Sequence, residues 1–187
     1  MRIIGGHFKG KKIFLPMDEN TRPLRDLVKE SIFNLILHSR KINVDINNSN
    51  ILDLFSGTGS FGIECISRGS NDVTFFENYK IALQVLKKNL EILNCIKNYK
   101  IIENNCFSYF SLEKNFEKKF DIIFIDPPYK EKKINFLIEK IIDQKILHQK
   151  GVIIIHRHKK DDLTITKKMN ILDTRIYGLS KIIIGNY

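Results

Sequence analysis

The sequence predicts an α/β fold built on a seven-stranded, mostly parallel sheet. After residue 50, short apolar runs alternate with amphipathic segments, which is typical of a parallel sheet covered by helices. The length of 187 residues is close to that of one domain. Hydrophobic residues make up 43% of the chain and charged residues 28%, which excludes a disordered chain. No apolar run approaches the roughly 18 residues that a membrane span needs.

The first fifteen residues predict a basic β-hairpin. Glycines at positions 5, 6 and 10 lie between two short apolar ends, residues 3–4 and 13–15. The segment has no acidic residue, and its basic residues are Arg2, His7, Lys9, Lys11 and Lys12.

A helix is expected from Pro23, whose fixed φ suits the first helical position. Residues 40–50 are rich in asparagine and weakly apolar, which marks a boundary. We therefore expect residues 1–45 to form a hairpin-and-helix appendage and residues 46–187 to form the main domain. The apolar stripe that should pack the helix on this domain is Leu24, Leu27, Val28, Ile32, Leu35 and Ile36.

Seven strands and at least two helices are expected in the main domain. A helix should begin near Ser60, and another has its apolar face at positions 82, 85, 86, 90 and 93. The last two strands have no long helix between them, so they should form an antiparallel hairpin at the sheet edge. The strand candidates are residues 51–55, 73–77, 100–103, 120–125, 152–156, 174–177 and 181–186.

Charge and cysteine usage narrow the class of protein. The 31 Lys and Arg residues exceed the 21 Asp and Glu residues, which gives a net charge of +10. This balance favours a polyanionic partner, either nucleic acid or an anionic membrane surface. Cysteines at positions 65, 95 and 106 form no CxxC motif and no Cys/His cluster, so no disulfide or metal site is expected. The N-terminus lacks the apolar stretch of a signal peptide, so we expect a cytoplasmic protein.

The first chemical motif is an apolar strand followed by a glycine loop and a helix. Gly57, Gly59 and Gly62 satisfy G-x-G-x-x-G, and Glu77 lies 20 residues after Gly57. This pattern is typical of adenosine cofactor sites, because glycines let the backbone approach and a carboxylate binds the ribose hydroxyls. NAD and S-adenosylmethionine fit equally well, and a glycine turn that serves only strand-to-helix packing would contain the same residues.

A carboxylate inside the first strand helps to separate the two cofactors. Asp53 would repel a pyrophosphate and attract an ammonium group. S-adenosylmethionine carries an ammonium and a sulfonium and no phosphate, so Asp53 favours it over NAD. Alternatively, Asp53 could cap the glycine turn.

The second chemical motif places Asp126, Pro127, Pro128 and Tyr129 at the end of the fourth strand, where ligands bind in open α/β sheets. The two prolines remove backbone donors, so the loop presents a carboxylate and carbonyl oxygens. An exocyclic amino group of a nucleobase could donate to Asp126 and to the Pro127 carbonyl, with its lone pair aimed at a methyl donor. Tyr129 could stack on the base. Alternatively, the loop only turns the chain.

Taken together, these motifs resemble the RsmD-type methyltransferases, which use S-adenosylmethionine to methylate guanine N2 in bacterial 16S ribosomal RNA. The resemblance covers nearly the whole chain. The N-terminal pieces are the specific ones, because many amino-methyltransferases share the glycine loop and Asp-Pro-Pro-Tyr. The matching pieces are residues 2–6, residues 21–23, Asp26, residues 28–34 and 53–62, Glu77, Asn105, residues 126–129 and residues 177–178.

The resemblance implies a Rossmann-like methyltransferase fold and a site for S-adenosylmethionine, without a metal. Glu77 would bind the ribose, Asn78 would lie beside the adenine, and Asn105 would bond the adenine edge. Residues 126–129 would hold the guanine. The full cofactor set would be Asp53, Phe55, Ser56, Gly57, Gly59, Glu77, Asn78, Asn105 and Cys106. The RNA contacts would come from Arg2, His7, Lys9, Lys11, Lys12, Arg22, Arg25 and Lys130, although residues 130–133 could equally be a solvated helix start.

Two departures from the family pattern stand out. Leu24, Arg25 and Leu27 replace two hydroxyls and a basic residue, and His156 stands where an acidic residue is expected. We interpret His156 as a half-buried strand-end histidine and not as a catalytic group. The expected partner is 16S rRNA, free or within a small ribosomal subunit or its assembly intermediate. We expect no membrane partner, and we expect the protein to be a monomer. Two rivals are an amino-methyltransferase acting on adenine N6 of DNA or another RNA, and a noncatalytic RNA-binding assembly factor.

Overall fold

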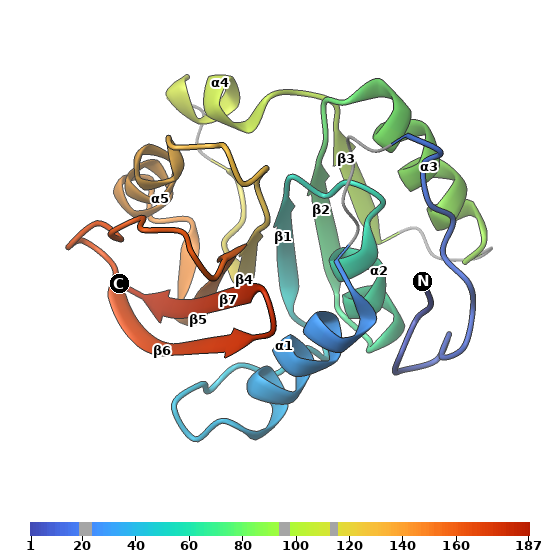
Figure 1. Cartoon of the computed structure of the whole chain (residues 1–187), viewed down its shortest axis with the longest axis horizontal. Coiled ribbons are helices and arrows are strands. Elements are labelled where there is room, and N and C mark those ends of the chain that lie inside the picture. The colour runs from blue at the N-terminus through green and yellow to red at the C-terminus, as the bar shows by residue number, and fades with distance from the viewer. Residues whose placement is uncertain (19–23, 94–97, 113–115) are drawn as a thin grey trace.

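The computed structural model describes residues 1–18, 24–93, 98–112 and 116–187 (Figure 1). Its strands form one seven-stranded sheet in the order β3-β2-β1-β4-β5-β7-β6. The strands are β1 Asn50–Leu54, β2 Asp72–Phe76, β3 Tyr99–Ile102, β4 Phe120–Ile125, β5 Leu147–His158, β6 Asn170–Tyr177 and β7 Ser180–Asn186. The helices are α1 Asp26–His38, α2 Ser60–Ser67, α3 Lys80–Glu91, α4 Cys106–Ser111 and α5 Ile134–Asp143.

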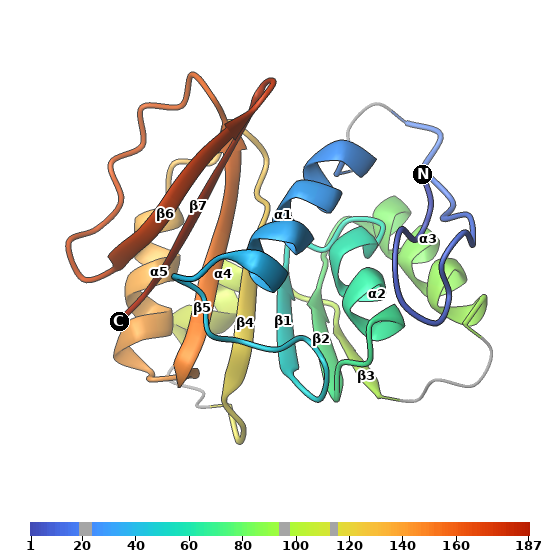
Figure 2. The ribbon, with the colours of Figure 1, turned by 90° about the horizontal axis from the view of Figure 1, so that it is seen from below.

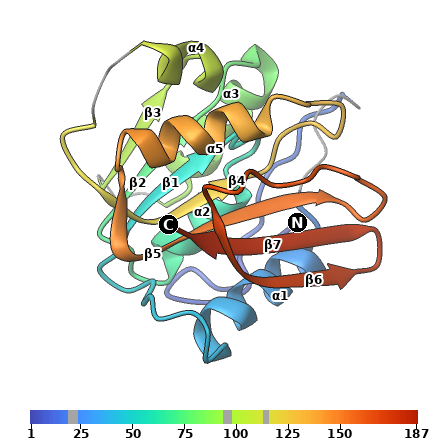
Figure 3. The same cartoon turned by 90° about the vertical axis from the view of Figure 1, so that its left-hand side faces the viewer.

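All seven predicted strands are present, and the predicted antiparallel hairpin is confirmed. Strands β1 to β5 pair in parallel, whereas β7 pairs antiparallel with both β5 and β6. Strand β7 thus lies between β5 and β6, at the edge that faces the viewer in Figure 3. Strand β5 is longer than expected, because it begins at Leu147 and continues to His158.

Two hydrophobic cores lie on the two faces of the sheet. Successive strand residues point to opposite faces, so Ile51 and Leu52 belong to different cores. The core that contains Ile51 is covered by α1, α2 and α3, and the core that contains Leu52 is covered by α4 and α5. Figure 2 shows α1 and α2 lying together on the first face. Among the described residues, no helix is long and apolar enough to cross a membrane.

The N-terminal segment forms a short antiparallel pairing in place of a full two-stranded hairpin. Arg2 and Lys12 form a bridge, and hydrogen bonds on either side of it run from the residue 3 amide to the residue 11 carbonyl and from the residue 13 amide to the residue 1 carbonyl. The pairing is short because the next backbone amides bond to α2. The amides of residues 4 and 5 donate to Glu64, and those of residues 7 and 8 donate to Ser67. Gly6 permits this contact, because a Cβ there would meet the Ser67 carbonyl oxygen at 1.8 Å.

A buried charge network joins this segment to α1 and α2. Besides accepting the two backbone amides, Glu64 pairs with Lys29 of α1 at 3.4 Å and with Arg68 at 3.0 Å. Burial lowers the pKa of Lys29, and the Glu64 carboxylate opposes that shift. The side chains of Ile3 and Phe8 share the core of the sheet. The division of the chain near residue 45 stays a prediction.

Helix α1 buries a stripe rotated slightly from the predicted one. Val28, Ile32 and Ile36 are buried as expected, and Phe33 joins them by stacking on Phe61 at 5.2 Å. Leu27, however, is 69% exposed, so its inclusion in the stripe was wrong. Neighbouring helical positions are about 100° apart, and the buried face is centred on positions 28, 32, 33 and 36. The predicted start at Pro23 lies outside the described residues, and the helix is observed from Asp26.

Candidate active site at the carboxyl edge of the sheet

Three carboxylates gather at the carboxyl end of β1. Asp53 in β1 pairs in register with Phe75 of β2 on one side and with Phe124 of β4 on the other. Glu77 and Asp126 each lie two residues further along those strands, so they point to the same face as Asp53. The chain adds β2 and β3 on one side of β1 and then crosses over to add β4 on the other side. In open α/β sheets, ligands bind at the carboxyl ends of the strands where the strand order reverses in this way.

The loop after β1 has the backbone that the glycine motif predicts. Gly57 and Gly59 have φ values of 56° and 80°, and α2 begins at Ser60 as expected. Ser56 is buried, and it closes the turn by donating from its amide to the Phe76 carbonyl and from its hydroxyl to the Asp53 carbonyl.

Phe55 also has a positive φ, of 61°, in a region that non-glycine residues rarely adopt. Its ring lies 5.6 Å from that of Phe107, between centroids. Strain of this kind is concentrated at functional sites, where the surrounding structure maintains it.

Asp53 is 1% exposed, and its Oδ2 accepts the Gly62 amide at 3.0 Å. The carboxylate therefore does cap the turn into α2, which was the alternative that the sequence left open. Burial raises the pKa of Asp53 well above its usual value. The hydrogen bond from Gly62 opposes this rise, and the neighbouring carboxylates of Asp126 and Glu77 add to it. Three acidic side chains thus meet at one site of a chain whose net charge is +10.

Glu77 is oriented by three backbone amides. Its Oε2 accepts from Gly57 at 2.7 Å, and its Oε1 accepts from Asn78 at 2.8 Å and from Tyr79 at 2.7 Å. The carboxylate therefore bridges the glycine loop and the start of α3. The two oxygens offer about four acceptor sites, of which these amides use three, so an acceptor site on Oε2 remains for a ligand hydroxyl.

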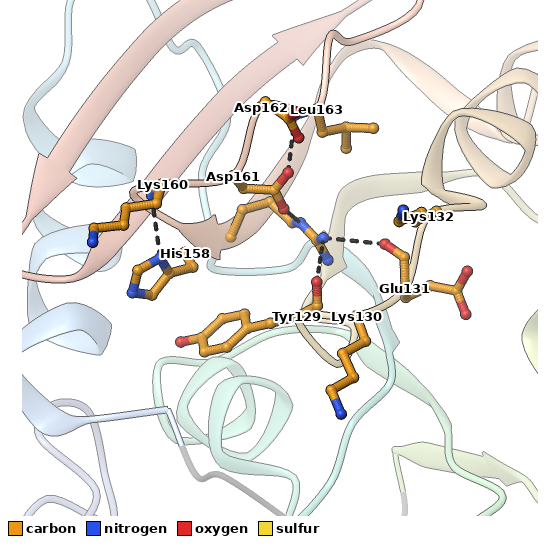
Figure 4. A pocket seen from close by; sticks show the side chains of 10 residues that line it. Tyr129, Lys130, Glu131, Lys132, His158, Lys160, Asp161, Asp162 and Leu163 are labelled. Carbon is orange, nitrogen blue, oxygen red and sulfur yellow. Dashed lines mark hydrogen bonds and ion pairs between the residues drawn. The ribbon is translucent and has the colours of Figure 1, made fainter.

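The loop from Asp126 to Tyr129 is held by two neighbouring residues of β5. Nδ1 of His156 lies 2.8 Å from Oδ1 of Asp126. On the opposite face of the strand, Arg157 is 2% exposed and pairs with Asp161. Its guanidinium donates to the carbonyls of residues 129 and 131 at 2.9 and 3.1 Å (Figure 4). It also donates to the carbonyl of residue 128 at 3.3 Å. None of these three contacts involves the Pro127 carbonyl, which is an expected acceptor for the amino group of the target base.

The pKa of the Asp161 carboxyl lies below its usual value. Burial alone would raise this pKa, but the hydrogen bonds from the Leu163 amide and from Arg157 lower it by more. The anchor of the loop is therefore a charged pair at neutral pH.

An open pocket of about 440 Å³ lies beside this loop. Tyr129 is 37% exposed and lies at this pocket, with its ring 5.4 Å from that of His158 in an edge-to-face arrangement. A base could therefore reach the Tyr129 ring. Both basic and acidic side chains contribute to the lining, which is formed by Tyr129, Lys130, Glu131, Lys132, Arg157, His158, Lys160, Asp161, Asp162 and Leu163.

The remaining cofactor candidates lie near the end of β3 and the end of β2. Asn78 is exposed directly after Glu77. Asn105 lies three residues beyond β3, and its Oδ1 caps α4 by accepting the amides of residues 107 and 108. Cys106 is buried in the second core, and burial raises the pKa of its thiol to about 12. It therefore packs as a small apolar residue.

The predicted RNA-binding residues are exposed wherever the structure describes them. Arg2, His7, Lys9 and Lys12 are exposed on the N-terminal segment, Arg25 directly precedes α1, and Lys130 lines the pocket. Lys11 is also exposed, but its Nζ donates to the Ile92 carbonyl and lies 4.8 Å from the Phe8 ring centroid. Arg22 lies outside the described residues.

Sequence reasoning missed Arg157, Ser180 and Asn89. Asn89 is buried on α3, where its Nδ2 donates to the Thr58 carbonyl in the glycine loop and to the Phe14 carbonyl. The available signal was a polar residue on an apolar helical face. Arg157 had a similar signal, because it interrupts the apolar run of a buried strand.

A doubly wound sheet with this strand order, a glycine loop after β1 and an acid after β2 defines the Rossmann-like fold of S-adenosylmethionine-dependent methyltransferases. The model of the family described as "Conserved hypothetical protein 95" matches residues 1–186, and the chain belongs to this family. The predicted kinship with the small-subunit rRNA methyltransferases D is confirmed.

Several relatives carry the name ribosomal RNA small subunit methyltransferase D, among them those of two bacteria. The one from Buchnera aphidicola subsp. Acyrthosiphon pisum is 34% identical and aligns over 93% of this chain and 86% of its own. The one from Haemophilus influenzae is 30% identical and aligns over 96% and 90%. The solved structure of yhhF from Escherichia coli is 26% identical, with a TM-score of 0.82, and covers 99% of this chain and 96% of that one.

Proposed function

We propose that this protein transfers a methyl group from S-adenosylmethionine to the exocyclic N2 of a guanine in 16S rRNA. The observation that carries the proposal is the meeting of two unlike sites at one strand end. Asp53 and Glu77 form an acidic cluster beside the glycine loop, and the acceptor loop from Asp126 to Tyr129 lies across β1 from Glu77. A cationic donor and an amino group would be brought together there.

S-adenosylmethionine fits the acidic cluster of Asp53 and Glu77. Asp53 is a buried carboxylate with two other carboxylates nearby, so a cationic ligand would relieve their repulsion and a pyrophosphate would increase it. Asp53 would pair with the ammonium group, and Glu77, already oriented by three amides, would accept from the ribose hydroxyls. When bound, S-adenosylmethionine supplies an electrophilic methyl carbon.

The protein's part in the reaction is to orient the attacking amino group. Asp126 and the Pro127 carbonyl would accept its two N–H groups, and Tyr129 would stack on the base. Arg157 fixes the loop that carries these groups by bonding the carbonyls of residues 128 and 129 and that of residue 131 just after it. Such positioning contributes several kcal/mol to a two-substrate reaction.

The RNA would be held by exposed basic side chains. The chain has a net charge of +10, and Lys9 and Lys12 project from a segment that α2 holds in place. Bases inside a duplex hide the edge that must react, so the target guanine would lie in a loop or be flipped out of its stack.

Incubation of the full chain with methyl-labelled S-adenosylmethionine and 16S rRNA from a strain lacking the modification tests this function. Naked rRNA and small subunits would be compared, and the labelled nucleoside identified after digestion. Labelled N2-methylguanosine that depends on Asp126 is expected. N6-methyladenosine would overturn the choice of base. Failure to bind S-adenosylmethionine in calorimetry would point to a noncatalytic assembly factor.

A further inference from the structure

We infer that His156 and Ser180 act as a positioning pair for Asp126, a role that rests on the proposed function. A short hydrogen-bonded chain runs from the loop into the sheet. Oδ1 of Asp126 lies 2.8 Å from Nδ1 of His156, and Nε2 of His156 lies 2.8 Å from Oγ of Ser180. The three residues come from the ends of β4, β5 and β7.

The topology of the sheet brings these side chains to one face. Asp126 lies two residues after Phe124, which pairs with Ile154 of β5, so Asp126 and His156 are level on neighbouring strands. Strand β7 runs antiparallel beside β5 and pairs His158 with Ser180. Had β6 taken that place, Ser180 would lie at the outer edge of the sheet and away from His156.

The hydrogen-bonded chain from Asp126 to Ser180 is largely shielded from water. The side chain of His156 is 7% exposed and that of Asp126 is 19% exposed, whereas Ser180 is buried. Both ring nitrogens of His156 thus meet protein groups. The other neighbour of the imidazole is the Tyr129 ring, at 6.2 Å between centroids. Asp126 also interacts electrostatically with a second carboxylate, that of Asp53.

The donor and acceptor roles follow from chemistry. An ionised carboxylate can only accept, so Nδ1 of His156 must carry the proton that it donates to Asp126. In neutral imidazole, Nε2 is then an acceptor, and the Ser180 hydroxyl donates to it. With the opposite tautomer, a lone pair on Nδ1 would face the carboxylate. Asp126 therefore selects this tautomer, and Ser180, whose hydroxyl can donate or accept, satisfies Nε2 and fixes the orientation of the ring.

For the reaction, this means that one oxygen of the Asp126 carboxylate is already bonded and that the orientation of the carboxylate is fixed. Because His156 holds Oδ1, Asp126 meets the target amino group with Oδ2, and it stays a hydrogen-bond acceptor. His156 does not touch the base or the cofactor in this account, so it acts through Asp126. Partners of this kind around a reacting group commonly change rates by about 10- to 100-fold when removed.

Methyl transfer to rRNA by the full-length protein, with kcat and the KM for S-adenosylmethionine measured separately, tests the inference. His156→Ala should lower kcat by about 10- to 100-fold without changing this KM. His156→Asn should recover most of the lost kcat, because its amide nitrogen can take the place of Nδ1. His148→Ala, an exposed histidine at the other end of β5, serves as the matched control.

A double-mutant cycle isolates the role of Ser180. Ser180→Ala alone should lower kcat by about 3- to 10-fold, because Nε2 of His156 then loses its partner and the imidazole is held at one nitrogen. In the His156→Asn background, which has no Nε2, Ser180→Ala should have little further effect. Additive losses would show that Ser180 does not act through His156 and would overturn its part in the positioning pair.

The outcomes separate this inference from the proposed function. A wild-type protein that methylates no guanine in rRNA would overturn the proposed function. An active wild type with unchanged kcat in His156→Ala, or with equal losses in His156→Ala and His156→Asn, would overturn only the positioning pair. Circular dichroism of each variant confirms that the fold is retained.

Discussion

Replacing Asp53 by asparagine should make the free protein more stable and the cofactor complex weaker. The carboxylate is 1% exposed, burial raises its pKa well above the usual value, and Asp126 and Glu77 raise it further. The substitution Asp53→Asn would remove the buried charge and keep an oxygen that can accept the Gly62 amide, which now donates at 3.0 Å.

The two opposing effects differ in size. A hydrogen bond to a charged acceptor is about 1 kcal/mol stronger than one to a neutral acceptor, and this difference is lost in the variant. Burial of an incompletely paired charge costs several kcal/mol, and this penalty is removed. At a pH above the raised pKa, where Asp53 is ionised, we expect a net gain of about 1–2 kcal/mol, or roughly 2–8 °C in Tm. Loss of the ammonium partner should weaken S-adenosylmethionine binding by about 10- to 100-fold.

The pH dependence provides a second readout. Because the folded pKa of Asp53 is raised, its favourable contribution is fully present below the ordinary carboxyl pKa of about 4 and is lost as pH rises through the raised value. The wild type should lose stability over that window relative to Asp53→Asn. Melting scans and calorimetry test both effects, with the exposed Glu91→Gln as control. A lower Tm with unchanged affinity would refute the reasoning.

Three further changes have clear expected outcomes. Arg157→Lys replaces a guanidinium that bonds three loop carbonyls, so kcat should fall by about 10- to 100-fold, and unchanged turnover would contradict its role as an anchor. Charge reversal of the exposed Lys9 and Lys12 should weaken RNA binding and reduce the slope of log affinity against log salt by about one for each phosphate that is no longer neutralised; an unaltered slope would remove the N-terminal segment from the interface. Burial raises the thiol pKa of Cys65 and Cys106, so iodoacetamide at a mildly alkaline pH of about 8 should label neither in the folded protein, and peptide mapping that finds either one modified would contradict this burial.

The strands and the two motifs could be predicted because their signals are local. An apolar run followed by Gly57 and Gly59 specifies a strand, a turn and a helix start within a dozen residues. Glu77 and Asp126 were placed correctly because the carboxyl ends of parallel strands meet at one edge.

The short length of the N-terminal pairing and the role of His156 depend on residues distant in the sequence, so neither could be predicted. The N-terminal amides bond to Glu64 and Ser67, roughly 60 residues away, and nothing near them in the sequence indicates this. His156 meets Ser180 only because β7 is inserted beside β5. The histidine was noticed as a departure from the family pattern, but its partners could not be predicted without the strand order.

A crystal structure with S-adenosylhomocysteine would show where and how the cofactor binds. We expect the ribose hydroxyls within hydrogen-bond distance of Glu77, the ammonium group beside Asp53, and the sulfur facing the loop from Asp126 to Tyr129. A ligand bound elsewhere, or one whose ribose does not contact Glu77, would contradict this expectation.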